Sequence, residues 1–509
     1  MNIKLYISFL TLIALTFSAC KTDITDLNVN PNDSLESDPE LLFKHSIRRG
    51  MSSYLTATNL EYNGISHWVM NFAARGGINT NIPYVSPPGG DAFWQEAYVD
   101  AMNNAQVIID REESAGEDFS SLKAVALIWK TYVAHRITDL WGAIPYSQAL
   151  QGNPELSFAP AYDTQREVYE KMLSDLALAL EQIENSSSNI APESDLLFAG
   201  DLQKWKEFAN SLRFRLAIRV SDVDENMASE VLIDLATEEL FTSNASSAEF
   251  QFNSVFNSPL NEAGNIRFFE GEQYVNPSKF LVDLLVESND PRIKFYLEEA
   301  NLYNTFDFLD QYKGVPNLLS FNSEEWDDYD LDETLGDPNG EWGDVSRIGE
   351  FFMNNERPVP LLSYSELCLL KAEAVLKGLW NGSADDLVKE GIRSHMEHMN
   401  FHNYSDHENI EDQDIDDYVS GISGVDLEEV ITQKWILLAY ENTLESFTEL
   451  RRTGFPTLVD FYGESIDNSI FPQRLKYPNS ESTLNQDNYL EALDMQGPDE
   501  LSTPLWWSN

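Results

Sequence analysis

Cysteine is scarce in this sequence, in which 509 residues contain only Cys20 and Cys368. If Cys20 is modified, Cys368 has no partner, so an internal disulfide cannot hold the fold together. Cys368 lies in the apolar stretch Leu367-Cys368-Leu369-Leu370, where a free cysteine behaves as a small hydrophobic side chain. We therefore expect Cys368 to be a core residue and not a nucleophile. The chain is long enough to bury a large core without covalent support.

Basic residues are also few, with 33 Lys and Arg against 85 Asp and Glu, a net charge of −52. Such a field repels phosphate backbones and anionic membrane surfaces, which excludes nucleic-acid binding. It also disfavours uronic or sulfated polysaccharides as ligands and leaves neutral ones. Aromatic residues make up 12% of the chain, with 11 Trp, and this excludes general disorder.

No apolar run near the N-terminus is long enough to span a bilayer. Residues 5–17 are apolar but fall short of the roughly 20 residues that a spanning helix needs. Lys4 precedes the run, and the small residues Ser18 and Ala19 follow it, directly before Cys20. This arrangement resembles a bacterial lipobox, so we expect a signal peptide over 1–19 and a lipid anchor on Cys20. Residues 20–36 are then a polar tether, and 37–509 form a single domain.

Catalytic motifs are missing too. The sequence has no Gly-x-Ser-x-Gly elbow, no phosphate-binding glycine loop and no His-Glu-x-x-His. With 85 carboxylates, a pair spaced for glycoside hydrolysis has no specificity. We do not expect an enzyme.

Cofactor signals are weak. His395-x-x-His398 lacks a third ligand at metal spacing and is interpreted as a solvated pair. Asp412-x-Asp414-x-Asp416 begins like a calcium loop, but it has Asp417 where the loop needs Gly and Ser423 where it needs Glu. No cofactor is expected, although a looser structural calcium site there or near 327–332 remains open.

Most of the chain has the sequence patterns of α-helices. Asp38-Pro39 is an N-cap followed by a first-turn proline, and predicts a helix over about 39–57. Thr164-x-x-Glu167 is a capping box. Further helices are predicted over 93–112, 119–138 and 201–221, the last with Arg213, Arg215 and Arg219 on its polar side.

Towards the C-terminus the helices are predicted in pairs. Ser363 and Ser383 cap two helices that run to about 378 and 399, and Asp426 caps a third that runs to about 440. A fourth follows over 443–452. Two helices within about 38 residues are typical of a tetratricopeptide-type hairpin, although the strict repeat consensus is absent.

Two long irregular stretches, 60–92 and 321–345, interrupt the helices, and long loops in a compact domain are usually functional. A sugar ring stacks on an exposed aromatic face, beside side chains that hydrogen-bond its hydroxyls. The stretches supply candidates of both kinds: Trp68, Asn71, Arg75 and Tyr84 in the first, and Trp326, Tyr329 and Trp342 in the second. Other tryptophans, Trp94 among them, are expected in the core, and Trp506-Trp507 is expected to clamp the C-terminal tail.

Several short segments resemble a known family. They are, in order, Leu27-Asn28-Val29-Asn30-Pro31-Asn32, Asp139-Leu140-Trp141-Gly142-Ala143-Ile144-Pro145-Tyr146, Asn289-Asp290-Pro291-Arg292, Ser363-Tyr364-Ser365-Glu366 continuing to Lys371-Ala372-Glu373-Ala374, Glu449-Leu450-Arg451-Arg452-Thr453-Gly454-Phe455-Pro456, and Arg474-Leu475-Lys476-Tyr477-Pro478. Their order and content are similar to those of the SusD/RagB nutrient-binding outer-membrane lipoproteins, in particular the second SusD-like subfamily. Gln473 departs from the family pattern, which commonly has Arg before Arg474. We expect Trp129, Trp141, Arg136 and Asp139 to pack the helices rather than to touch ligand.

The resemblance implies a mostly α fold with a scaffold of tetratricopeptide-type helix pairs, long ligand-binding loops and little β structure. It also implies an anchored position on the outer surface of the outer membrane. The partner that it implies is a SusC-like TonB-dependent transporter, to which a bound oligosaccharide is delivered. A peptide ligand, as in RagB-like receptors, remains the alternative.

Overall fold

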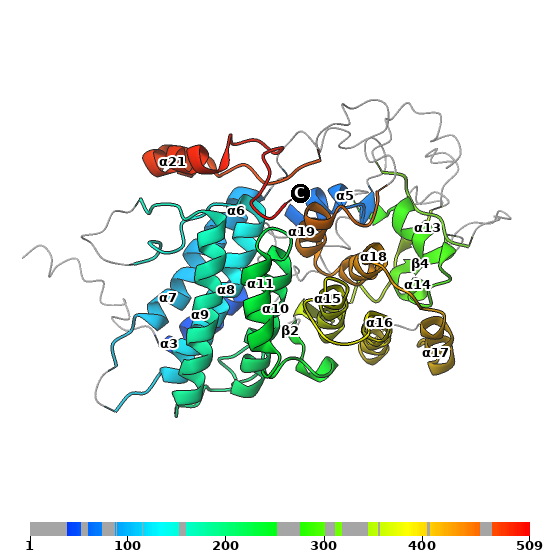
Figure 1. Cartoon of the computed structure of the whole chain (residues 1–509), viewed down its shortest axis with the longest axis horizontal. Coiled ribbons are helices and arrows are strands. Elements are labelled where there is room, and N and C mark those ends of the chain that lie inside the picture. The colour runs from blue at the N-terminus through cyan, green and yellow to red at the C-terminus, as the bar shows by residue number, and fades with distance from the viewer. Residues whose placement is uncertain are drawn as a thin grey trace, which may run out of the picture.

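The computed structural model describes residues 38–51, 60–73, 87, 89–113, 116–151, 159–251, 275–300, 311–317, 345–354, 357–404, 408–458 and 471–508. Helices dominate these residues, as predicted (Figure 1). Across these ranges the model contains no helix with the length and apolar character needed to cross a membrane.

The N-terminal half is a layer of helices in which α8 lies centrally and packs against α7, α9 and α10. Its helices are α3 (Pro39–Gly50), η1 (Glu61–Ile65), α5 (Ser66–Trp68), α6 (Gly90–Gln95), η3 (Glu96–Met102), α7 (Asn103–Ile109), α8 (Ser120–Trp141), α9 (Gln165–Asn185), α10 (Leu202–Val220) and α11 (Glu225–Leu235). The helix predicted over 93–112 is interrupted by the π-helical segment η3 and ends at Ile109. Helix α3 ends at Gly50, before the predicted residue 57.

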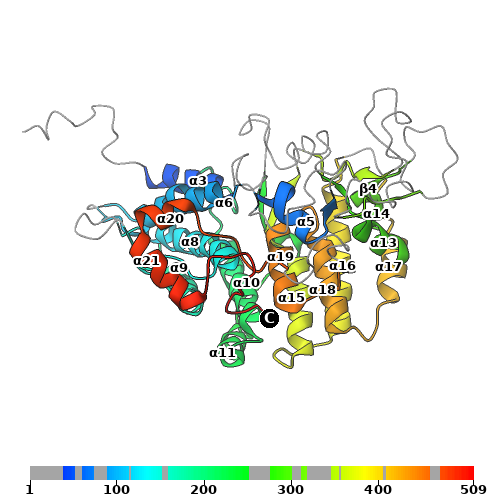
Figure 2. The ribbon, with the colours of Figure 1, turned by 90° about the horizontal axis from the view of Figure 1, so that it is seen from above.

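The C-terminal half contains the predicted helix pairs. Its helices are α13 (Lys279–Glu287), α14 (Ile293–Tyr296), α15 (Tyr364–Leu376), α16 (Ala384–Phe401), α17 (Asp412–Ser420), α18 (Leu427–Leu438), α19 (Thr443–Thr453), α20 (Asn479–Leu484) and α21 (Gln486–Gln496). Helix α15 packs against both α16 and α18, and α18 packs against α19, as Figure 2 shows from above. The chain then returns to the first half, where the Trp141 indole donates to the Lys476 carbonyl over 2.8 Å.

Strands in the described ranges are short and form three two-stranded antiparallel sheets. The pairs are β1 (Phe72–Ala73) with β3 (Asn276–Pro277), β2 (Ala248–Gln251) with β6 (Pro358–Leu362), and β4 (Leu297–Glu298) with β5 (Arg347–Ile348). The prediction of little β structure is confirmed. Of these strands, β2 matters most for function, because it carries Glu249 opposite Pro360 of β6.

Side-chain caps explain where several helices begin. Ser363, Ser383 and Asp426 each accept a hydrogen bond from the backbone N–H three residues later, at the first turns of α15, α16 and α18. Thr164 and Glu167 form the predicted capping box of α9. Each cap satisfies an otherwise unpaired N–H and contributes about 1 kcal/mol to stability. The capping residues therefore predicted the first residues of these helices correctly.

Large apolar side chains fill two hydrophobic clusters, one mainly in each half. Trp129 and Trp141 are fully buried, as expected, and Cys368 and Trp94 are also core residues. Trp507 is buried at the C-terminal tail, where its ring lies under the guanidinium groups of Arg219 and Arg451. The predicted clamp is thus present.

The arginines of α10 do not form a polar outer side, which corrects the prediction for this helix. Arg215 and Arg219 are only 1% exposed and lie between the two halves. Arg215 Nη2 is 2.7 Å from Glu366 of α15, and Arg219 Nη2 is 2.7 Å from Glu445 of α19. Burial of these charges is tolerated because carboxylates from other helices neutralise them.

The same buried region joins three of the six short segments that carry the family resemblance. Arg452 pairs with Glu373 at 2.6 Å and with Glu449 at 2.6 Å, and Arg219 Nε is 3.4 Å from Asp139. We call this group the ion network: Asp139, Arg215, Arg219, Glu366, Glu373, Lys434, Glu445, Glu449 and Arg452. Its members come from α8, α10, α15, α18 and α19, so it holds five helices in register.

Candidate ligand-binding site

A recessed cavity of about 520 Å³ lies where the C-terminal end of α16 faces strand β2. The start of β6 and the first turn of α10 complete its walls. The side chains that line it are Leu197, Phe198, Lys204, Asn244, Ala245, Ser247, Glu249, Gln251, Pro358, Glu397, His398, Phe401 and His402. This volume falls within the range of small-molecule binding sites, about 300–1,000 Å³.

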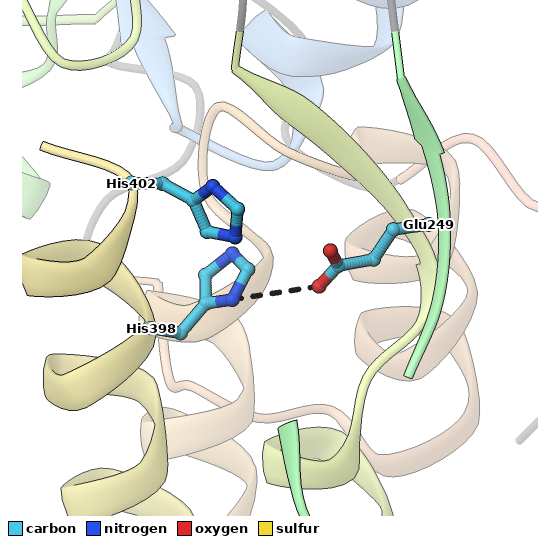
Figure 3. A group of neighbouring side chains, drawn as sticks. All are labelled: Glu249, His398 and His402. Carbon is cyan, nitrogen blue, oxygen red and sulfur yellow. Dashed lines mark ion pairs between the residues drawn. The ribbon is translucent and has the colours of Figure 1, made fainter. Parts of the chain in front are cut away.

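Three ionisable side chains meet on one wall of the cavity. His398 lies in the last turn of α16, and His402 follows one turn later at its C-cap. Both rings therefore project from the same side of the helix. Glu249 points towards them from β2, with Oε1 3.4 Å from His398 Nδ1 (Figure 3). The two imidazole centroids are 4.6 Å apart.

Burial shifts the titration of all three groups towards their neutral forms. Desolvation, with a smaller contribution from Glu441, raises the pKa of Glu249 to about 8. Burial lowers the pKa of His398 to about 3, and lowers that of half-buried His402 to about 4. Near neutral pH the imidazoles are uncharged, so their ring nitrogens have lone pairs available to a ligand.

The interpretation of His395 and His398 as a solvated pair is wrong. His395 is 3% exposed and His398 is 9% exposed, because β2 and the helices next to α16 cover this face. His395 Nδ1 lies 3.3 Å from Arg292 Nη1, within the turn that Asp290 and Arg292 form. His395 belongs to the packing of that turn, whereas His398 faces the cavity.

Two of the ligand-binding residues predicted from the sequence lie in the described ranges, and both are buried. Trp68 is 1% exposed and packs against Phe447 with ring centroids 5.4 Å apart. Asn71 is fully buried in the turn between α5 and β1. The Trp68 ring thus presents no open face for stacking in this structure. The other predicted site residues lie outside the described residues: Cys20, Arg75, Tyr84, Trp326, Tyr329 and Trp342.

The cavity residues were missed by sequence reasoning for a clear reason. His398 and His402 have the i, i+4 spacing that places two side chains on one helix face, and this signal is visible in the sequence. Their third neighbour, Glu249, lies in a short strand far away along the chain. Only the fold brings it to α16.

A second group of potential metal ligands consists of His135, Asp139 and Glu445, all buried. Their cavity measures only about 10 Å³, room for a single water. Arg215 and Arg219 already neutralise the two carboxylates, which are members of the ion network. The acidic run considered for calcium forms the first turns of α17, and among the described residues it brings no three ligands together.

The described ranges are mostly helical, and the cavity lies beside a small antiparallel strand pair. The family model SusD-like_2, described as "Starch-binding associating with outer membrane", matches residues 31–478. The chain belongs to this family. No curated protein matches the chain significantly.

Solved structures agree over nearly the whole length. A chitin-binding protein is 26% identical, with a TM-score of 0.78, covering 93% of this chain and 100% of that one. A SusD homologue from Bacteroides fragilis is 23% identical, with a TM-score of 0.76 and coverage of 92% and 99%. A SusD homologue from Bacteroides uniformis is 24% identical, with a TM-score of 0.71 and coverage of 93% and 100%. The predicted SusD-like fold is confirmed.

Proposed function

We propose that the protein is a cell-surface lipoprotein that binds an oligosaccharide and delivers it to a SusC-like TonB-dependent transporter. The observation that carries this proposal is the family match over residues 31–478, in a family described as starch-binding and associated with the outer membrane. The lipobox-like sequence at Cys20 supports anchoring by lipid. On this proposal 1–19 is a signal peptide, 20–36 a tether and 37–509 one ligand-binding domain.

We propose a neutral glycan as the ligand. A net charge of −52 disfavours polyanionic chains, and the relative at 26% identity is named as a chitin-binding protein. Chitin oligosaccharides are uncharged, so the two observations agree. Neutral β-linked N-acetylhexosamine chains are therefore the first ligands to test, with neutral glucans next.

The proposed contacts are aromatic stacking by Tyr84, Trp326, Tyr329 and Trp342, with Arg75 as a hydrogen-bond donor. Each residue comes from one of the two long irregular stretches of the sequence. Trp326 and Trp342 offer the largest ring faces.

A peptide ligand is the second candidate, and the cavity beside α16 favours it. The cavity is recessed and bears the amide side chain of Gln251, a group that can donate to and accept from a peptide backbone. A flat aromatic platform would suit a sugar better.

The test is affinity electrophoresis through gels cast with neutral and charged polysaccharides. The protein carries Cys20→Ser so that no lipid is attached. We expect retardation in a neutral glycan gel and none in uronic or sulfated gels. Trp326→Ala and Trp342→Ala should reduce the retardation, and Leu484→Ala is the control, because Leu484 is a large apolar side chain that is 80% exposed on α20 and does not line the cavity. Free migration of the parent protein in every gel, together with capture of peptides from a defined mixture, would overturn the glycan proposal.

A further inference from the structure

The cavity beside α16 has a donor set that suits a metal ion. One ligand atom from each of Glu249, His398 and His402 lies within 4.8 Å of the others. The rings and the carboxylate converge from two different elements, as Figure 3 shows. Two imidazoles one helical turn apart and a carboxylate from a neighbouring strand form a common three-ligand set for zinc.

The distances are close to those of a coordinated ion. Ligands at about 2.0–2.1 Å around a tetrahedral ion lie about 3.3 Å from each other. Glu249 Oε1 and His398 Nδ1 are 3.4 Å apart, so this pair already has that spacing. His402 offers an atom within 4.8 Å of the other two, so it must move by at most about 1.5 Å to reach tetrahedral spacing. Its ring is only half buried, which leaves room for this adjustment.

Unused lone pairs point to a ligand in the same place. Among the described residues, buried Glu249 Oε1 and His398 Nε2 accept or donate no hydrogen bond. A buried polar atom without a partner destabilises a fold by about 1–3 kcal/mol. Coordination of a cation by Glu249 Oε1 would satisfy this carboxylate oxygen.

Neighbouring groups fit the same interpretation. His402 Nδ1 lies 3.4 Å from the Tyr404 hydroxyl, a contact that orients the ring and leaves Nε2 available. Lys204 also lines the cavity, but its ammonium group donates to the Ala245 carbonyl over 2.8 Å. Glu397 adds a second carboxylate to the wall.

We propose that Glu249, His398 and His402 bind one divalent transition-metal ion of the zinc type. Imidazole nitrogens favour zinc, copper or nickel over calcium and magnesium, which prefer oxygen ligands. Three protein ligands leave a fourth position open towards the cavity. Water, or a donor atom of a molecule held in the cavity, can occupy that position. This proposal does not depend on the glycan proposal.

The test is zinc titration by calorimetry of untagged protein, stripped with a chelator, at neutral pH. We expect one saturable equivalent. His402→Ala and Glu249→Gln should weaken binding by about 100-fold or more, since loss of even an outer-shell partner costs 10–100-fold. His45→Ala is the control, because His45 is an exposed histidine on α3, in the other half. Cobalt bound at the same site should show the visible bands of a four-coordinate ion, lost in His402→Ala.

Two results would overturn the proposal. One is the absence of saturable zinc uptake by the parent protein. The other is unchanged uptake in both His402→Ala and Glu249→Gln, which would place the metal elsewhere. Thermal unfolding of each variant in chelator shows whether it is folded, so that a lost site is distinguished from a lost fold.

Discussion

The ion network and the α16 cavity both bury ionisable side chains, but they satisfy them differently. In the ion network each carboxylate faces a guanidinium or ammonium group, as Glu366 faces Arg215 at 2.7 Å. In the cavity Glu249 faces two imidazoles instead, and burial raises its pKa to about 8. Charged side chains that are neutralised by partners within the protein indicate a structural role. A carboxylate and two imidazoles that converge on the wall of a cavity indicate a place for a ligand.

The largest expected effect is in the ion network. Arg219→Ala leaves Glu445, Glu449 and Asp139 without their shared partner, and removing one member of a buried pair costs about 3–5 kcal/mol. Urea unfolding followed by circular dichroism measures the loss. Arg166→Ala is the control, because Arg166 is 56% exposed where it pairs with Asp224. It should cost at most about 1 kcal/mol. Equal losses for the two variants would contradict the structural role of the network.

A smaller effect is expected from Glu445→Gln, and it depends on pH. Burial opposes ionisation of Glu445, yet Arg219, Arg215 and Lys434 hold its pKa well below the usual range. A depressed pKa stabilises the fold above the unfolded-state value, near 4.3, and this stability is lost as the pH falls further. Glu445→Gln should therefore cost roughly 2 kcal/mol or more at pH 7 and progressively less towards pH 3. Unfolding titrations across this pH range check it. A difference that does not change with pH would show that Glu445 is not ionised in the fold.

In the cavity the expected effect has the opposite sign. Because the pKa of Glu249 is raised to about 8, folding favours the protonated acid, and wild-type stability falls as the pH rises from the unfolded-state value towards 8. Glu249→Gln mimics the neutral acid. In chelator its stability relative to wild type should increase as the pH rises from 5 to 8, because only wild type must then ionise a buried carboxyl group. Thermal unfolding at the two pH values measures this gain. A loss of stability at pH 8 would place Glu249 with the structural charges.

Much of the scaffold could be predicted because its signals are local. Ser383 and Asp426 predict helix starts because each side chain can accept a hydrogen bond from the backbone N–H three residues later. The structure has both caps. The burial of Arg215 could not be predicted in this way, because its partner Glu366 is 151 residues away. An arginine that recurs along a helix gives the same local pattern whether it faces water or a distant carboxylate. Here the tertiary fold, and not the local pattern, decided its environment.

The site was harder to predict than the scaffold. Aromatic residues in long loops suggested Trp68 as a platform, but a tryptophan near a helix is equally suited to the core, and Trp68 packs there. Of the three histidines on or next to α16, the sequence drew attention to His395 and His398. The two histidines that lie near Glu249 are His398 and His402. This pair can be told from His395 and His398 only by the position of Glu249 in strand β2.

The pairing of Arg219 from the first half with Glu445 and Glu449 from the second has a consequence for how the chain folds. Neither half can close its own interior without leaving ionised groups in an apolar medium. A half-folded molecule would carry that electrostatic cost alone. We therefore expect the two halves to fold and unfold in one cooperative transition, with no stable half-molecule exposed to proteases.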